Sequence, residues 1–397
     1  MRKILTCQLL KLQLISQCMF VKEVISFSEN QDFLNFPKKL YKNNPDWVCP
    51  LDKDIEEIFD PSLNRNFENG EAKRWLLLDD SGKIIGRIAA FYTHKSLVQP
   101  DIKSGGIGFF ECIHDQHAAN ILFDKAKTWL QEIGFEAMDG PINFGERDKF
   151  WGLLVQGFKN PSYQENFNFP YYRELFETYG FKQIFEQTTS EINFDLFKKD
   201  RLEKPYDRVS KNPAYSFEHF KMNQLEKFSS DFIEIYNKAW EKRIDFEPLT
   251  QKRMETTLHS IKPILIEEGI WFAYANNEPA GFFVNVIDVN QIFKHLNGKL
   301  DLWGKIKFVW FKKFGNVNRI RGIVFGVVPK YQNLGLETAM IMKVFNSMKK
   351  FPKIQSAELS WIGDFNPKMH SLFNAVGAKS TKIHYTYRLI WDKKSAQ

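Results

Sequence analysis

The stretch FGVVPKYQNLGLETAM, residues 325–340, decides how the second half of the chain is predicted to fold. Residues 320–328 form an apolar run that predicts a buried strand, and Pro329 ends it because proline cannot donate to a strand ladder. Residues 334–350 show apolar positions at helical spacing, which predicts a helix. The amides of residues 332–336 therefore gather at a helix N-terminus, where they lack intrahelical partners and face the positive end of the helix dipole. Such a turn can hold the oxygens of a diphosphate.

Length and composition indicate a folded protein of two domains. At 397 residues the chain exceeds what one hydrophobic core usually organises. Its 43% hydrophobic and 26% charged residues are typical of soluble globular proteins and exclude extensive disorder. The four cysteines form no CxxC pair, so they predict neither a disulfide framework nor a zinc knuckle, and they favour a cytoplasmic location. No segment has the ~20 apolar residues of a membrane span, and we expect no nucleic-acid partner.

Residues 1–18 are interpreted as an extension that need not be native. Their basic start and apolar middle resemble a secretory signal, but Lys11 and three glutamines interrupt the apolar part. Met19 lies directly before the first predicted strand and is an alternative start of the chain.

The two halves of the chain repeat one design. The stretches RWLLLDDSGKIIGRIAAFY (74–92) and IWFAYANNEPAGFFVNV (270–286) both predict a hairpin. The stretches LFETYGFK (175–182) and LFNAVGAK (372–379) both predict a helix closed by a glycine and followed by a strand. Residues 198–216 are charged, contain two prolines and lack apolar periodicity, so we interpret them as a linker. We expect domains at 19–197 and 217–397, each a mixed, mostly antiparallel α/β sheet flanked by helices.

Positive charge is concentrated in one segment. The whole chain has a formal charge of +7, and residues 294–321 hold eight basic residues against a single acid, Asp301. Trp303, Ile306, Val309 and Trp310 recur between the lysines at helical spacing. One interpretation is a solvated amphipathic helix. The other is a landing site for an anionic partner, such as a phosphorylated cofactor, an acidic carrier protein or a lipid surface.

The turn at 332–337 resembles that of the GNAT superfamily of acyl-CoA-dependent N-acyltransferases. The family signature is Q/R-x-x-G-x-G/A, which Gln332 and Gly335 match and from which Glu337 departs. The following strand at 357–362 and Asn366 also resemble the family pattern. The resemblance covers residues 217–391 well and 20–195 more weakly, so the chain is identified as a tandem pair of GNAT-like domains.

This resemblance implies an acyl-CoA, acetyl-CoA or another, as cosubstrate and no metal. The residues expected at the cofactor are Val327, Val328, Gln332, Asn333, Leu334, Gly335, Leu336, Glu337, Asn366 and Phe373. We expect Gly335 to lie where the backbone approaches the diphosphate, so that a larger residue would abolish CoA binding with little effect on stability.

Family chemistry is the direct attack of an amine on the thioester, with a base taking the amine proton and an acid protonating the thiolate. Glu358 is the leading candidate for the base, and an outward-facing strand glutamate is the alternative. The usual acid is a tyrosine in the final helix, but Phe373 stands there, so Tyr331, Tyr385 or Tyr387 must substitute or no dedicated acid exists. Asp288 is a second candidate, as an anchor for the amine, although Asp and Asn here also suit a helix cap.

The first half lacks the amide turn and is predicted to be a copy that has lost cofactor binding. At the place that corresponds to residues 332–337, the predicted strand ending near Cys112 leads into the next helix through His114, Asp115 and Gln116, without a glycine. Cys112, His114 and His117 have no common zinc spacing, and a helix cap explains the polar residues, so no metal is predicted. The aromatic-rich insertion at 140–172 is expected either to pack on the other domain or to wall a substrate cleft.

The sequence thus predicts an N-acyltransferase that uses acyl-CoA in its C-terminal domain and acylates an amine of unknown identity. Two alternatives stay open. One is an N-acyltransferase that takes its acyl group from an acidic carrier protein docked at Lys294–Arg321. The other is a catalytically silent GNAT-fold binding module, which Glu337 and Phe373 favour.

Overall fold

The structure is a computed structural model that describes residues 19–97, 102–145, 147, 149–242 and 247–391. The predicted extension at 1–18 lies outside these residues. The chain forms two compact units. Unit 1 contains the described residues up to Phe185, Asn297–Lys299 and the described residues from His384 onward. Unit 2 contains Glu186–Leu296 and Leu300–Ile383.

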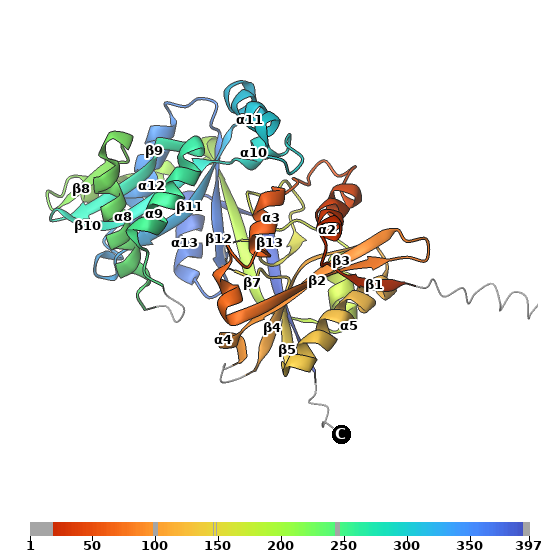
Figure 1. The fold of residues 1–397 in the computed structure, drawn as a ribbon. Coiled ribbons are helices and arrows are strands. Elements are labelled where there is room, and N and C mark those ends of the chain that lie inside the picture. The colour runs from red at the N-terminus through yellow and green to blue at the C-terminus, as the bar shows by residue number, and fades with distance from the viewer. Residues whose placement is uncertain (1–18, 98–101, 146, 148, 243–246, 392–397) are drawn as a thin grey trace, which may run out of the picture. The chain divides into compact units, whose positions relative to one another are not determined.

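Unit 1 is a mixed sheet with helices on both faces (Figure 1). Its strands run in the order β1-β2-β3-β4-β5-β13, and only the β4–β5 pair is parallel. The strands are β1 (Phe20–Glu23), β2 (Gly70–Leu78), β3 (Ile84–Thr93), β4 (Ser104–Cys112), β5 (Ala137–Gly140) and part of β13 (Lys379–Ile390), with β6 (Leu153–Gln156) beside β13. The helices are α2 (Phe27–Leu40), α3 (Asp52–Ile58), α4 (His94–Leu97), α5 (Gln116–Ile133) and α6 (Tyr172–Tyr179).

The apolar alternation along β2 and β3 explains why both faces of this sheet are covered. Trp75 and Ile88 belong to the core that includes the apolar face of α5. Their chain neighbours Leu76 and Ala89 point to the opposite face, where they join α2 and α3 in a second core. The apolar residues of α5 lie on one face of the helix, which ends at Gly134 with a left-handed φ of 99°.

Unit 2 repeats this architecture. Its strands run in the order β7-β12-β11-β10-β9-β8, and only β11–β12 is parallel. The strands are part of β7 (Lys182–Asn193), β8 (Tyr215–His219), β9 (Leu265–Ala275), β10 (Glu278–Ile287), β11 (Arg319–Val327) and β12 (Ser356–Gly363). The helices are α7 (Lys199–Ser210), α8 (Leu225–Trp240), α9 (Gln251–Ile261), α10 (Asn290–Phe293), α11 (Leu302–Phe314), α12 (Leu336–Met348) and α13 (Pro367–Val376). Adjacent Phe282 and Phe283 face the α8 core and the α12 core respectively. The predicted fold class, two mixed and mostly antiparallel sheets flanked by helices, is confirmed.

The chain is divided differently from the predicted domain boundaries. β7 begins in unit 1 and continues in unit 2, whereas β13 begins in unit 2 and ends in unit 1. The strand that closes each sheet therefore enters from the other half of the sequence. Residues 198–216, interpreted as a linker, instead contain helix α7. Leu202 and Val209, seven residues apart and so on one helical face, bury this helix in the unit 2 core.

In both units the parallel strand pair is short, and its inner strand carries a bulge. In unit 1 the register runs from Ser104–Ala137 to Gly106–Asp139, and β4 bulges around Phe109, where φ is 50°. In unit 2 the register runs from Arg319–Ser356 to Gly322–Leu359, and Ile323 is the extra residue of the bulge. Bulges re-aim side chains and interrupt pairing, so both units have an irregular point at the same place in the fold.

Candidate functional site

The predicted diphosphate turn is present in unit 2, but part of it is already occupied by the protein. Gly335 has a φ of 88° and α12 begins at the next residue, as a tight strand-to-helix turn requires. The Gln332 amide donates to the Pro329 carbonyl at 3.3 Å. The Asn333 amide donates to Glu337 Oε1 at 3.4 Å. A phosphate at this turn would therefore have to displace the Glu337 carboxylate.

Gly335 serves packing as well as the turn. A Cβ at this position would lie 2.8 Å from Val209 Cγ2 of α7. Contacts this short are not found for real Cβ atoms, and the left-handed φ adds strain for any other residue. Substitution at Gly335 is therefore expected to destabilise the fold, in contrast to the sequence-based expectation of little effect on stability.

The other residues predicted at the cofactor have mostly structural partners. Val327 and Val328 are buried in the two cores, and the Val328 amide donates to Ala280 at 2.9 Å. The Asn366 side chain caps α13 by accepting from the Met369 amide at 3.3 Å. Phe373 packs, half-buried, against the α12 core. Leu336 is buried and Leu334 is exposed.

Two of the three predicted catalytic residues meet in a closed cluster of charges. Arg319 donates to Asp288 Oδ2 from Nη2 at 2.6 Å and from Nε at 2.9 Å. Its Nη1 atom lies 3.2 Å from Glu358 Oε2, and Lys382 Nζ lies 3.0 Å from the same oxygen. Asp288 and Glu358 are each 1% exposed. Buried carboxylates are tolerated only when cations and hydrogen bonds compensate them, and this cluster supplies both.

Electrostatics within the cluster follow from burial and from opposed charges. Burial raises the pKa of Asp288, and the Arg319 guanidinium works against that rise. Burial disfavours the charge of Arg319, but the carboxylates of Glu358 and Asp288 outweigh it and raise the pKa of Arg319. Asp288 Oδ1 also accepts from the Asn290 amide at 3.2 Å. The N-cap residue of α10 is Val289, and no side chain caps this helix, in contrast to the alternative interpretation of Asp288 and Asn290 as a cap. Tyr331, the third predicted catalytic residue, is not part of this cluster. Its hydroxyl donates to Glu278 Oε2 at 2.9 Å in an exposed hydrogen bond. A role for Glu358 as base stays a prediction, and its closed surroundings favour a structural ion pair.

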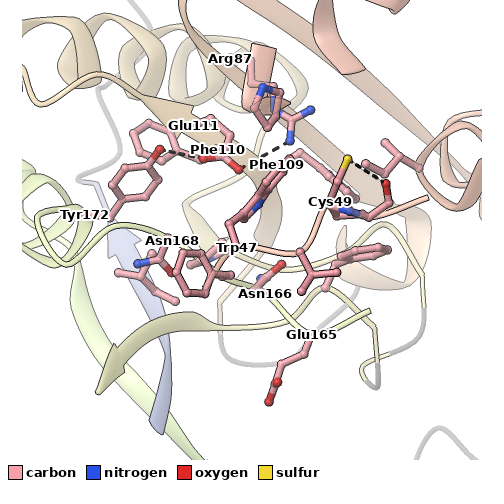
Figure 2. Close-up of a pocket in the computed structure, with 18 of the residues that line it drawn as sticks. Trp47, Cys49, Arg87, Phe109, Phe110, Glu111, Glu165, Asn166, Asn168 and Tyr172 are labelled. Atoms are coloured by element: carbon pink, nitrogen blue, oxygen red, sulfur yellow. Dashed lines mark hydrogen bonds and ion pairs between the residues drawn. The ribbon is translucent and has the colours of Figure 1, made fainter. Parts of the chain in front are cut away.

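Unit 1 contains a polar cavity that the sequence did not predict. It has a volume of about 60 Å³ and lies beyond the point where β4 and β5 part. Aromatic side chains form much of its wall, namely Trp47, Phe109, Phe110, Phe150 and Phe167. Phe150, Gly152, Leu153 and residues 165–168 also line it, so part of the insertion at 140–172 forms the wall of this cavity. Figure 2 shows Arg87, Glu111 and Tyr172 converging at one side of this space.

Glu111 is the centre of the polar group. Its Oε2 atom accepts hydrogen bonds from the Tyr41 hydroxyl at 2.6 Å and from the Tyr172 hydroxyl at 2.7 Å. Its Oε1 atom lies 3.7 Å from Arg87 Nη2. Burial raises the pKa of the Glu111 carboxyl, although Arg87 and the two hydroxyls oppose the rise. A carboxylate with a raised pKa is a stronger base than an ordinary glutamate, which suits it to accepting a proton.

Local structure fixes each member of this group. Arg87 and Glu111 are direct cross-strand partners on β3 and β4, just beyond the bulge at Phe109. Tyr41 closes helix α2 and stacks on Phe169 with ring centroids 4.6 Å apart. Tyr172 is the first residue of α6, and its hydroxyl accepts from the Cys112 amide at 2.9 Å. The hydroxyl that donates to Glu111 is therefore held in place by the backbone of β4.

One signal in the sequence points to this group. Arg87 interrupts the apolar run IIGRIAAFY and Glu111 interrupts GIGFFEC. A single charge within each of two neighbouring buried strands predicts a buried ion pair, because neither charge is stable there alone. The tyrosines carry no such signal, since aromatic residues also fill cores.

The described part of the chain indicates neither a cysteine nucleophile at the cavity nor a metal centre. Cys49 lines the cavity, but burial raises the pKa of its thiol to about 12, so it stays protonated and weakly nucleophilic. Within the described ranges, no three His, Cys, Asp or Glu side chains gather to hold a metal ion.

Comparisons with known proteins identify the fold. A solved tandem GNAT protein from the clavulanic acid biosynthesis pathway superimposes with a TM-score of 0.55, covering 95% of this chain and all of that one at 11% identity. The chain has the tandem GNAT fold. The sequence-based resemblance to this superfamily is thus confirmed in the fold. No protein-family model matches the sequence.

Two curated proteins are similar to the GNAT-fold chain over nearly its whole length. Protein YghO of Escherichia coli (strain K12) is 24% identical over 94% of this chain and 96% of its own length. The bacterial ceramide synthase of Caulobacter vibrioides is 25% identical over 91% of this chain and 94% of its own length.

Proposed function

We propose that this chain is an N-acyltransferase and that the acyl transfer takes place at the unit 1 cavity. The observation that carries the proposal is Glu111, a buried carboxylate with a raised pKa that lines a cavity and accepts from two tyrosine hydroxyls. The tandem GNAT fold and the similarity to a bacterial ceramide synthase support the reaction class.

The proposed chemistry needs a base because an amine with a pKa of ~10 is mostly protonated at neutral pH. Glu111 takes one proton from the ammonium group. The free amine attacks the thioester carbonyl, a C–N bond forms, and the C–S bond breaks with its electron pair going to sulfur. The amine nitrogen gives up its second proton to solvent, and the thiolate gains a proton. Tyr172 can supply that proton and recover it from Glu111, to which it donates at 2.7 Å.

A long-chain amine is the proposed acceptor. A ceramide synthase acylates the amino group of a long-chain base, and the relative with that name matches 91% of this chain. The cavity, at about 60 Å³, has room for an amino group and not for a long chain. The hydrocarbon part of such an acceptor must therefore lie outside it, along the aromatic wall or beyond.

Acyl-CoA is the proposed donor of the acyl group. Separately from the unit 1 cavity, the α12 turn at residues 332–337 is a candidate binding site for a diphosphate within unit 2. Amides at a helix N-terminus support this assignment, and it requires the Glu337 side chain to turn away from Asn333. The proposals for this turn and for the base rest on different observations.

The test of the function is a turnover assay with the full chain. Palmitoyl-CoA is offered with a long-chain amino alcohol, and released thiol is measured together with the amide product by mass spectrometry. We expect amide formation and one thiol for each amide. Glu111→Gln keeps the shape of the side chain and should be nearly inactive. A short amine such as ethanolamine should be a poor acceptor.

Two results would count against the proposal. Absence of turnover with every amine tested would favour the silent binding module. Full activity of folded Glu111→Gln would remove the unit 1 cavity from the reaction.

A further inference from the structure

Helix α11 has an outward face made of large apolar side chains. Leu302, Trp303, Ile306, Val309, Trp310 and Phe314 are each between 51% and 73% exposed. Trp303, Ile306, Trp310 and Phe314 follow one another at intervals of three and four residues, so they form one continuous stripe. Soluble surfaces rarely expose so many contiguous large apolar groups, and such patches mark interaction sites.

The outward face is not needed to hold α11 in place. The helix is fixed by its opposite side, where Gly304 is buried and Phe308 and Phe311 pack into a small core with Ile287, Ile292 and Val317. The Phe311 ring also stacks on His295 with centroids 3.8 Å apart. Asp301 caps the helix by accepting from the Gly304 amide at 2.8 Å. The helix is therefore rigidly presented with its apolar stripe toward solvent.

Lysines border and cross this stripe. At 100° per residue, Lys307 lies at one edge, Lys305 and Lys312 lie at the other, and Lys313 falls between Leu302 and Ile306. Lys305, Lys307 and Lys313 are exposed. Asp301 is the only acidic residue from 294 to 321, so the segment that contains the stripe is strongly positive.

We propose that α11 docks on the surface of an anionic lipid bilayer and lies in the plane of the interface. A helix of 13 residues is about 20 Å long, which suits a helix lying along a membrane rather than crossing it. Trp303 and Trp310 would sit at the level of the headgroups, as tryptophan prefers. The lysine stems would reach past the apolar side chains to place their charges at lipid phosphates.

The charge pattern favours a bilayer over two other occupants. A second copy of the chain would bring two positive faces together, which opposes pairing through α11. An acidic carrier protein would match the lysines but would leave the six large apolar side chains against a polar surface. Anionic lipid is complementary to both features at once. Among described residues no helix is long and apolar enough to span a membrane. The proposal does not depend on the reaction that the chain catalyses.

The test is sedimentation of the full chain with vesicles of phosphatidylcholine alone and of phosphatidylcholine mixed with phosphatidylglycerol. We expect binding to the mixed vesicles that weakens with added salt. Trp303→Ala and Trp310→Ala should each weaken it about tenfold, since each removes a large buried side chain from the interface. Changing Lys305, Lys307 and Lys313 together to Gln should weaken it about a hundredfold on mixed vesicles and little on neutral ones.

The matched control is Phe27→Ala, which removes an aromatic residue of helix α2 that is at least as exposed as the two tryptophans. It should bind like the wild type, and all variants should keep the wild-type melting temperature because the changed side chains face solvent. Equal binding of Trp303→Ala and wild type would overturn the proposal. So would self-association in solution that Trp303→Ala abolishes while vesicle binding is absent, since a second copy would then occupy the face.

Discussion

Unit 1 and unit 2 share a strand order but differ where their parallel strands part. In unit 1 the strand beyond the bulge carries Glu111 into a cavity. In unit 2 the Ser360 hydroxyl donates to the carbonyls of Gly322 and Ile323, so a side chain ties the parting strands together. Unit 2 instead keeps the glycine turn before α12. A duplicated fold therefore need not keep its pocket and its glycine turn in the same copy.

The buried glutamates of the two units differ in how accessible they are to a substrate. Glu111 and Glu358 both face cations, and both are largely hidden from solvent. Glu111 lines a cavity, so a substrate amine can approach its carboxylate. Two of its hydrogen-bond partners are neutral hydroxyls, which leave the carboxylate able to accept a proton. Glu358 lies between Arg319 and Lys382 in a cluster with Asp288. Glu111 and Glu358 are both buried glutamates, and only their surroundings distinguish the proposed base, Glu111, from the structural ion pair of Glu358.

The largest expected effect is on stability and concerns the closed cluster of unit 2. Lys382→Met removes one cation from Glu358 and leaves a buried carboxylate undercompensated. Breaking a buried pair in this way costs about 3–5 kcal/mol in the free energy of unfolding, measured by urea denaturation. Lys199→Met breaks an exposed pair with Glu203 and should cost less than about 1 kcal/mol. Similar losses for the two variants would show that the cluster is not the closed ion network described above.

A smaller loss of stability is expected at the turn of unit 2. Gly335→Val must strain a left-handed backbone, at about 1–2 kcal/mol, and must also displace Val209, at about 1–3 kcal/mol more. Gly82→Val in unit 1 is the matched control, because its φ is +79° and no atom lies within 4 Å of the added Cβ. It should show the backbone strain alone. Equal losses at the two glycines would contradict the packing role of Gly335, and thermal unfolding of both variants decides between these outcomes.

The smallest expected effect is a shift in the pH dependence of the reaction at unit 1. The rate needs ionised Glu111, so it should fall as the pH drops through a pKa above the ordinary 4.5 of a glutamate. The Tyr172 hydroxyl lowers that pKa by donating to the carboxylate, so Tyr172→Phe should move the acid limb of the pH–rate profile upward. Tyr171→Phe is the control, because its hydroxyl donates to the Cys112 carbonyl instead. If the acid limb does not move in Tyr172→Phe, the limb does not report the ionisation of Glu111.

The sequence predicted features that depend on neighbours along the chain. The paired hairpins and the left-handed glycines Gly180 and Gly377 are set by local periodicity and backbone preference. Helix α7 was missed because its helical face carries only two buried apolar residues among many charges. The sequence also does not predict that β7 and β13 each contribute residues to both units, because no local sequence signal distinguishes such a strand from one that lies within a single unit.

The sequence signals only the Arg87–Glu111 pair of the proposed site, because the other parts of the site come from distant segments. Tyr41 and Tyr172 lie 70 and 61 residues from Glu111 in the sequence. The predicted base, Glu358, was chosen from its place on a strand, which does not reveal that Lys382 and Arg319 close around it. The turn at Gly335 was predicted correctly as a turn, because a strand, a proline and a helix start are local signals.

The central claim is that Glu111 of unit 1, and not Glu358 of unit 2, serves the acyl transfer. The direct test is the rate of thiol release by Glu111→Gln and Glu358→Gln with saturating acyl-CoA and a long-chain amine, each corrected for the folded fraction. Glu111→Gln should lose a factor of about 10²–10⁴, typical of a lost general base. Glu358→Gln should lower the melting temperature and leave the rate of the folded protein within a few-fold of wild type. The reverse pattern, a slow Glu358→Gln beside an active Glu111→Gln, would contradict the account and return the chemistry to unit 2.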